Sequence, residues 1–174
     1  MRMTVTALAL GLALMPRTVD AQGVPPERAR AAFERIKALA GQWQQASTKD
    51  WEGAQVIQVI AGGSAVLSTA RVDPHPASNE VMATLFHMDG DRLMLTHYCV
   101  ARNQPRLVAT SISDDGTVIE FTFLDGTNLQ SPGAGHMHRA VFTLETPDRY
   151  RSRWTFARNG QESWMEEIVT TRRR

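Results

Sequence analysis

From residue 41 onward the chain repeats short segments in which apolar and polar residues alternate. These segments recur roughly every eight to twelve residues and are separated by Gly, Asp, Asn and Pro. Three of the breaks are Asp89-Gly90, Asp115-Gly116 and Asn159-Gly160, which are typical of hairpin turns because their glycine accepts a positive φ. The pattern predicts an all-β fold: an antiparallel up-and-down β-barrel of about ten strands. We expect the strands at 42–48, 54–61, 64–72, 80–88, 92–100, 106–112, 117–124, 136–146, 149–158 and 162–171.

A short helix is expected just before the first strand. Pro25-Pro26 suits a helix start, because proline is tolerated in the first turn. Phe33, Ile36 and Leu39 then recur at helical spacing along one stripe, and Gly41 ends the segment. The helix is therefore expected to pack its apolar stripe against the barrel.

The first residues of the chain are typical of an export signal. Arg2 supplies a positive start, residues 4–15 are mostly apolar, and Val19-Asp20-Ala21 offers a small-residue cleavage site. The apolar run is too short for a bilayer, which needs roughly 20 residues, so we expect no stable membrane insertion. We expect residues 1–21 to be removed and residues 22–174 to form a single β-barrel domain, periplasmic or secreted.

Composition excludes some partners. The formal net charge is +1 and acidic and basic residues are mixed along the chain, so no strong field favours nucleic acid. Cys99 is the one cysteine, which rules out an intrachain disulfide. The core must therefore stabilise the fold unaided.

Two polar motifs suggest a site. The first is His97-Tyr98-Cys99, followed by Asn103-Gln104-Pro105-Arg106, and the second is His136-Met137-His138. Side chains two residues apart on a strand point to the same face, so His97 pairs with Cys99 and His136 with His138. We expect these residues to face one shared cavity, with Asn103 and Arg106 at its rim.

This arrangement predicts a protein that binds a small amphiphilic or carboxylated molecule. Arg106 could hold a carboxylate through its bidentate fork, or it could satisfy loop carbonyls at the rim. Apolar walls would supply most of the affinity, at roughly 25 cal/mol per Å² of apolar area buried. The candidate ligand-binding residues are His97, Cys99, Asn103, Gln104, Arg106, Asn128, His136, His138 and Trp154.

Other chemistries stay open. His97, Cys99, His136 and His138 could hold zinc, which accepts Cys and His in tetrahedral geometry, although we expect no cofactor. A histidine inside a barrel could also bind haem iron. An enzyme could use histidine as acid or base, or Cys99 as a nucleophile activated by His97, but no catalytic signature surrounds these residues. We favour a binding protein over an enzyme.

The sequence Leu39-Ala40-Gly41-Gln42-Trp43 resembles the Gly-x-Trp entrance of lipocalins and fatty-acid-binding calycins. In that superfamily the tryptophan closes one end of an antiparallel barrel, which implies a buried structural role for Trp43. The segments around His97 and His136 are similar to those of uncharacterised exported bacterial lipocalin-like proteins. The resemblance implies a barrel that binds a small, partly apolar ligand.

Overall fold

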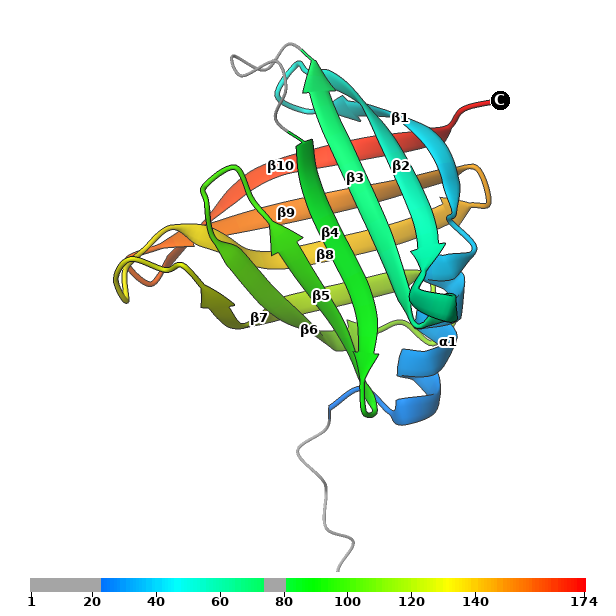
Figure 1. Cartoon of the computed structure of the whole chain (residues 1–174), viewed down its shortest axis with the longest axis horizontal. Helices are drawn as coiled ribbons and strands as arrows, with labels where there is room; N and C mark the ends of the chain where they lie inside the picture. The colour runs from blue at the N-terminus through cyan, green and yellow to red at the C-terminus, as the bar shows by residue number, and fades with distance from the viewer. Residues whose placement is uncertain (1–22, 74–80) are drawn as a thin grey trace, which may run out of the picture.

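The structure, a computed structural model, describes residues 23–73 and 81–174 (Figure 1). In this part of the chain, ten antiparallel strands form a closed barrel in which each strand pairs with its sequence neighbours and β1 pairs with β10. This confirms the predicted fold class. The expected signal segment, residues 1–21, lies outside the described residues. The strands are β1 (Gly41–Ser47), β2 (Glu52–Ile60), β3 (Ala65–Asp73), β4 (Val81–Asp89), β5 (Arg92–Tyr98), β6 (Gln104–Ile112), β7 (Val118–Thr127), β8 (His136–Thr146), β9 (Arg149–Arg158) and β10 (Gln161–Arg172).

The helix α1 (Pro26–Lys37) closes one end of the barrel (Figure 1). Its apolar stripe, which includes Phe33 and Ile36, is buried against the barrel. Trp43 is 0 % exposed beside this end, and its indole N–H donates to the Leu39 carbonyl at 2.9 Å. The Arg172 guanidinium stacks over the Trp43 ring at 4.2 Å. The prediction that Trp43 is buried at the closed end is confirmed.

The part of the barrel next to α1 is filled by side chains. Phe86, Phe121 and Phe142 contact one another with ring centroids 5.6 to 6.0 Å apart, at the tilted and edge-to-face angles that aromatic rings prefer. Leu93 and Leu107 are buried beside them. These side chains fill part of the barrel interior beside α1.

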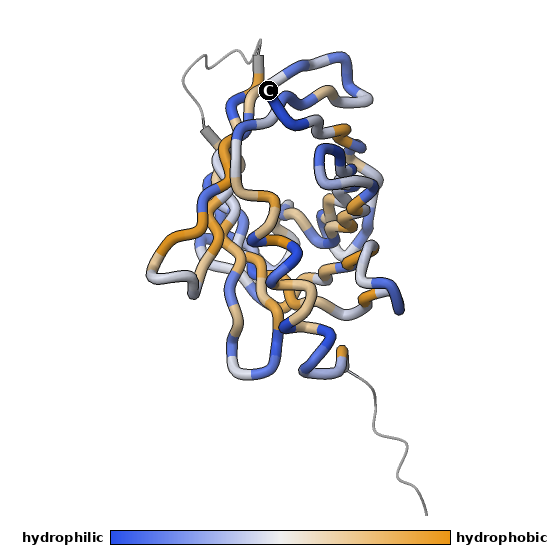
Figure 2. The backbone as a smooth tube through the Cα atoms, turned by 90° about the vertical axis from the view of Figure 1, so that its right-hand side faces the viewer, coloured by the Kyte–Doolittle hydropathy of each residue, from blue (hydrophilic) through white to orange (hydrophobic). Residues whose placement is uncertain are grey.

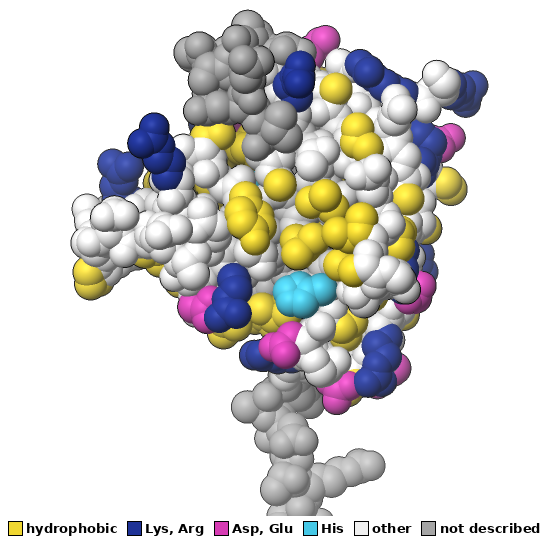
Figure 3. Space-filling model, viewed as in Figure 1, with side chains coloured by type: hydrophobic (Ala, Val, Ile, Leu, Met, Phe, Trp, Pro, Cys, Tyr) yellow, Lys and Arg dark blue, Asp and Glu magenta, His cyan; other side chains and the backbone are white. Residues whose placement is uncertain are grey.

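Apolar and polar residues alternate along the strands, as Figure 2 shows in the changing colour of the backbone tube. Hydrophobic side chains also gather on the outer face over β3, β4 and β5 (Figure 3). No helix among the described residues is long and apolar enough to cross a membrane.

Register shifts interrupt the pairing of β6 with β7, of β8 with β9 and of β9 with β10, and two of these β-bulges lie close to candidate polar residues. One lies between Met137 and Arg139 on β8, and the other lies between Trp164 and Glu166 on β10. A bulge adds one residue to one strand, so the side chains beyond it change faces. The bulge on β8 decides which side chains at the start of that strand enter the barrel.

Candidate functional site

A cavity of about 210 Å³ lies inside the barrel and extends to α1. Ile36 and Leu39, from and just after α1, form its floor, and Phe86, Phe142 and Trp154 contribute to its walls. This volume is below the range of about 300–1,000 Å³ that is usual for drug-sized ligands. The space therefore suits a small molecule with a largely apolar body.

Part of the cavity wall is a hydrogen-bonded chain of polar side chains from β9, β2 and β3. The Tyr150 hydroxyl donates to Gln55 Oε1, and Gln55 Nε2 donates to Ser68 Oγ at 2.7 Å. Burial raises the pKa of Tyr150 to about 12, so the hydroxyl keeps the proton that it donates. Gln45 also lines the cavity, and its buried Oε1 has no hydrogen-bond partner among the described residues.

His97 extends this polar wall onto β5. Its Nδ1 lies 2.9 Å from Thr84 Oγ1, and Thr84 is directly opposite Ser68 in the sheet register. The imidazole is 5 % exposed and packs on Trp154 with ring centroids 5.0 Å apart. Burial lowers the pKa of His97 to about 4, so the ring is neutral at pH 7. Its buried Nε2 has no partner in the described part of the chain.

Glu166 contributes the acidic side chain of the cavity wall. It is 6 % exposed, and its Oε2 accepts hydrogen bonds from Ser47 Oγ at 2.6 Å and from Trp51 Nε1 at 2.8 Å. Glu166 lies directly opposite Trp154 in the register, on the same inward face of β10 as Ile168 and Thr170. Sequence reasoning missed Glu166, although it has the strand spacing of Ile168, because a carboxylate on a strand usually faces solvent.

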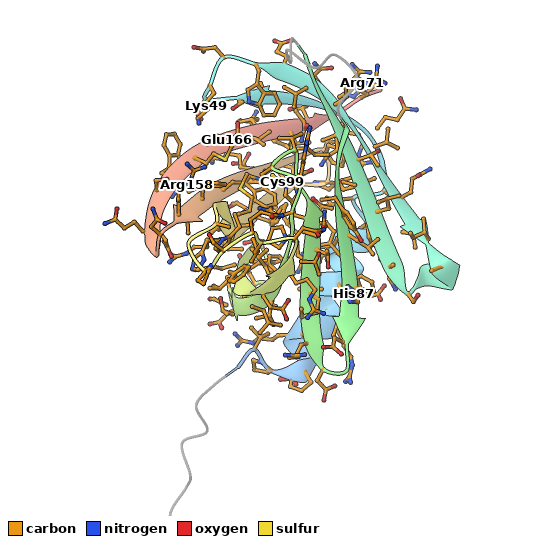
Figure 4. The ribbon with its side chains drawn as sticks, turned by 60° about the vertical axis from the view of Figure 1, so that its left-hand side comes forward. Lys49, Arg71, His87, Cys99, Arg158 and Glu166 are labelled. Atoms are coloured by element: carbon orange, nitrogen blue, oxygen red, sulfur yellow. The ribbon has the colours of Figure 1, made fainter. Side chains whose placement is uncertain are left out.

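Cys99, just after the end of β5, lines the cavity as Glu166 of β10 does (both are labelled in Figure 4), and β5 and β10 lie on opposite sides of the barrel. Burial raises the pKa of its thiol, which lowers the thiolate fraction that a nucleophile needs. Asn103 does not line the cavity. Its Nδ2 donates to the Gly135 carbonyl at 2.8 Å and so ties the β5–β6 connection to the β7–β8 connection.

The sequence predicted that His136 and His138 share the cavity of His97, but neither is among the residues that line it. The bulge after Met137 turns Met137 toward the cavity and the two histidines away from it, whereas unbroken alternation would have placed them on the face of Ala140. His136 Nε2 lies 3.3 Å from His138 Nδ1, and both rings pack on Phe123. They fill the space where β7 and β8 separate, because the pairing of these strands ends at Thr122 and Arg139.

The four residues of the zinc hypothesis do not come together as predicted, since His97 and Cys99 line the cavity and His136 and His138 do not. Across residues 23–73 and 81–174, no group of three or more His, Cys, Asp or Glu side chains is close enough to hold a metal ion.

Arg106, Gln104 and Asn128 also lie outside the cavity lining. The Arg106 guanidinium makes a bidentate contact with the Asp125 carboxylate on the outer face. Gln104 Oε1 accepts from Thr127 Oγ1 at 2.7 Å and from Asn128 Nδ2 at 2.6 Å. The structure thus gives Arg106 a carboxylate partner within the chain and does not place it at the cavity. Of the predicted ligand-binding residues, those that line the cavity are His97, Cys99 and Trp154.

The fold is a closed ten-stranded antiparallel barrel. No model of a protein family matches the chain, and no curated protein matches it. Among solved structures, it is similar to a protein of unknown function from the DUF3598 family of Nostoc punctiforme, with 11 % sequence identity and a TM-score of 0.46. The similarity covers 78 % of this chain and 47 % of that protein, so the chain spans about half its length.

Proposed function

We propose that this protein is an exported, lipocalin-like binding protein that holds a small amphiphilic molecule in its barrel. The observation that carries the proposal is the cavity of about 210 Å³, closed at one end by α1 and bounded by apolar walls and a polar chain. Gln45 Oε1 and His97 Nε2 are buried in this wall without partners among the described residues. Buried polar atoms without partners are costly, so a ligand that bonds to them gains affinity.

The lining changes what we expect of the ligand. The described residues that line the cavity include no Lys or Arg, and His97 is neutral at pH 7 because burial lowers its pKa to about 4. A carboxylate would therefore enter without a cationic partner, beside Glu166. We propose an amphiphile that is not an anion, in place of the carboxylated ligand that the sequence also allowed.

Calorimetric titration with 1-octanol and octylamine tests this function. The variant Ala70→Trp fills the cavity, because Ala70 lines it, whereas Thr69→Trp adds the same side chain on the opposite face of β3. We expect wild type and Thr69→Trp to bind at least one of the two amphiphiles saturably, and Ala70→Trp to lose binding at least tenfold. The proposal is contradicted if wild type binds neither 1-octanol nor octylamine. It is also contradicted if Ala70→Trp binds them as tightly as wild type does.

The proposed export depends on the signal-like pattern of residues 1–21. N-terminal sequencing of protein recovered from the periplasm or medium should begin at or near Gln22, and uncleaved protein in the cytoplasm would contradict the proposed export.

Metal analysis and an absorption spectrum of the same untagged protein would reveal zinc or haem, the alternatives to a protein without a cofactor.

A further inference from the structure

The cavity carries one formal charge among the described residues that line it. That charge belongs to Glu166, whose side chain is almost fully buried. A buried carboxylate loses much of its hydration, which two hydrogen bonds from Ser47 and Trp51 replace in part. Both donors bond to Oε2, and no described residue donates to Oε1. A ligand with a positive charge would complete the environment of this carboxylate.

Two indole rings flank Glu166. Trp51 donates to it directly at 2.8 Å, and Trp154 is its register partner on β9, where facing side chains lie about 5 Å apart at Cβ. Both indoles line the cavity. Tryptophan faces attract cations, and a carboxylate beside aromatic faces is a favourable site for an ammonium group.

A second, independent feature also favours a ligand that donates hydrogen bonds. Gln45 is 4 % exposed, lines the same cavity from β1, and its Oε1 has no partner among the described residues. A carbonyl oxygen can only accept a hydrogen bond. Glu166 and Gln45 thus offer acceptors to the cavity from neighbouring strands, β10 and β1.

We propose that the cavity binds an amphiphilic amine, and that Glu166 binds its protonated amino group while the apolar walls hold the hydrocarbon part. This inference rests on the proposed function, because it names the chemical class of the ligand. The amine N–H groups donate to Glu166 Oε1, and the indoles of Trp51 and Trp154 provide cation–π contacts. No covalent step is involved.

The test compares octylamine, 1-octanol and octanoate, which differ chiefly in the charge of the polar end. Calorimetric titration at pH 7 should give an octylamine affinity at least tenfold above that of 1-octanol, with octanoate weakest. The variant Glu166→Gln should lower the octylamine affinity about tenfold and leave that of 1-octanol within twofold. The matched control is Glu167→Gln, which removes the same charge from the next residue. Glu167 pairs with Arg151 and Arg153 outside the cavity lining, so this variant should bind like wild type.

The outcomes separate the two proposals. If 1-octanol and octylamine bind wild type equally well, the barrel binds amphiphiles but the amine preference is overturned. If neither binds, both proposals fail. If Glu166→Gln does not fold, the variant Trp51→Phe takes its place, because it keeps the carboxylate and removes one of its hydrogen-bond donors and one indole. The preference for octylamine over 1-octanol should then fall at least threefold. An unchanged preference would count against the site. The wild-type series remains decisive in either case.

Discussion

The two histidine motifs of this chain look alike in sequence and occupy different environments in the structure. His97 lies inside the barrel, 5 % exposed, bonded to Thr84 and stacked on Trp154. His136 and His138 lie where β7 and β8 separate, on the ring of Phe123, and the His138 side chain is 27 % exposed beside Glu162.

One extra residue in the β8 backbone accounts for the difference. Without the bulge between Met137 and Arg139, alternation would direct both motifs inward, as the sequence predicted. The comparison teaches that backbone register, and not residue type, decides which histidines belong to the cavity. The same register leaves the neutral imidazole of His97 enclosed in the barrel and the imidazoles of His136 and His138 partly exposed to solvent.

The largest expected effect is on stability in acid. Burial lowers the folded-state pKa of His97 to about 4, whereas the unfolded chain has the ordinary value of 6.5. Between these values the unfolded state binds the proton more readily, so the free energy of unfolding should fall as pH drops from 6.5 to 4 and then level off for this group. The loss attributable to His97 is about 3 kcal/mol, measurable by urea unfolding across this pH range.

Glutamine variants provide the control for that prediction. His97→Gln cannot take up the proton and should lose most of the slope between pH 6.5 and 4, while His136→Gln should keep it. His138, whose pKa is also lowered by burial, adds a contribution of the same sign in all of these proteins. An equal slope in wild type and His97→Gln would break the contrast between the two motifs.

Much of the fold follows from the sequence, because hairpin dipeptides and regular alternation are local signals. Ten strands, the helix before Gly41 and the buried Trp43 were all predictable. The expected start of β6 at residue 106 is two residues late, since Gln104 already pairs with Thr127. Such boundaries depend on pairing between strands, which residue types alone do not specify.

The site was less predictable, because its polar residues resemble solvent-facing ones. Gln45 and Gln55 share the face of Trp43 and Ile57, and this spacing was the available signal that they point inward. Glu166 shares the face of Ile168 in the same way, whereas the exclusion of His136 depends on a bulge, for which the sequence offers no comparable signal. The sequence therefore predicted the barrel better than it predicted what faces the cavity.

A smaller effect is expected from the hydrogen bond that orients His97. Thr84→Val keeps the shape of the side chain but removes the hydroxyl 2.9 Å from His97 Nδ1, leaving that buried nitrogen without a partner. We expect a loss of about 1–2 kcal/mol in the free energy of unfolding. The matched control is Thr122→Val, which removes an exposed hydroxyl from a Thr110–Thr122 contact of the same 2.9 Å length. Its stability should stay within about 0.5 kcal/mol of wild type, and similar losses in the two variants would show that enclosure does not matter here.

The smallest expected effect is on the reactivity of Cys99, which lines the same cavity as His97. Burial raises the pKa of the thiol, so less thiolate is present at pH 7 and alkylation by iodoacetamide should be several-fold slower in the folded protein than in urea. Octylamine or 1-octanol in the cavity should slow it further by limiting access to the sulfur. The alkylated fraction is measured by mass spectrometry at intervals, with Ala70→Trp, whose cavity is filled, as the reference for a protein that ligand cannot protect. An alkylation rate equal to that of the unfolded chain would place the thiol in solvent and contradict its position on the cavity wall. If the amphiphile slows alkylation in wild type and not in Ala70→Trp, the reactivity of Cys99 reports whether the barrel holds a ligand.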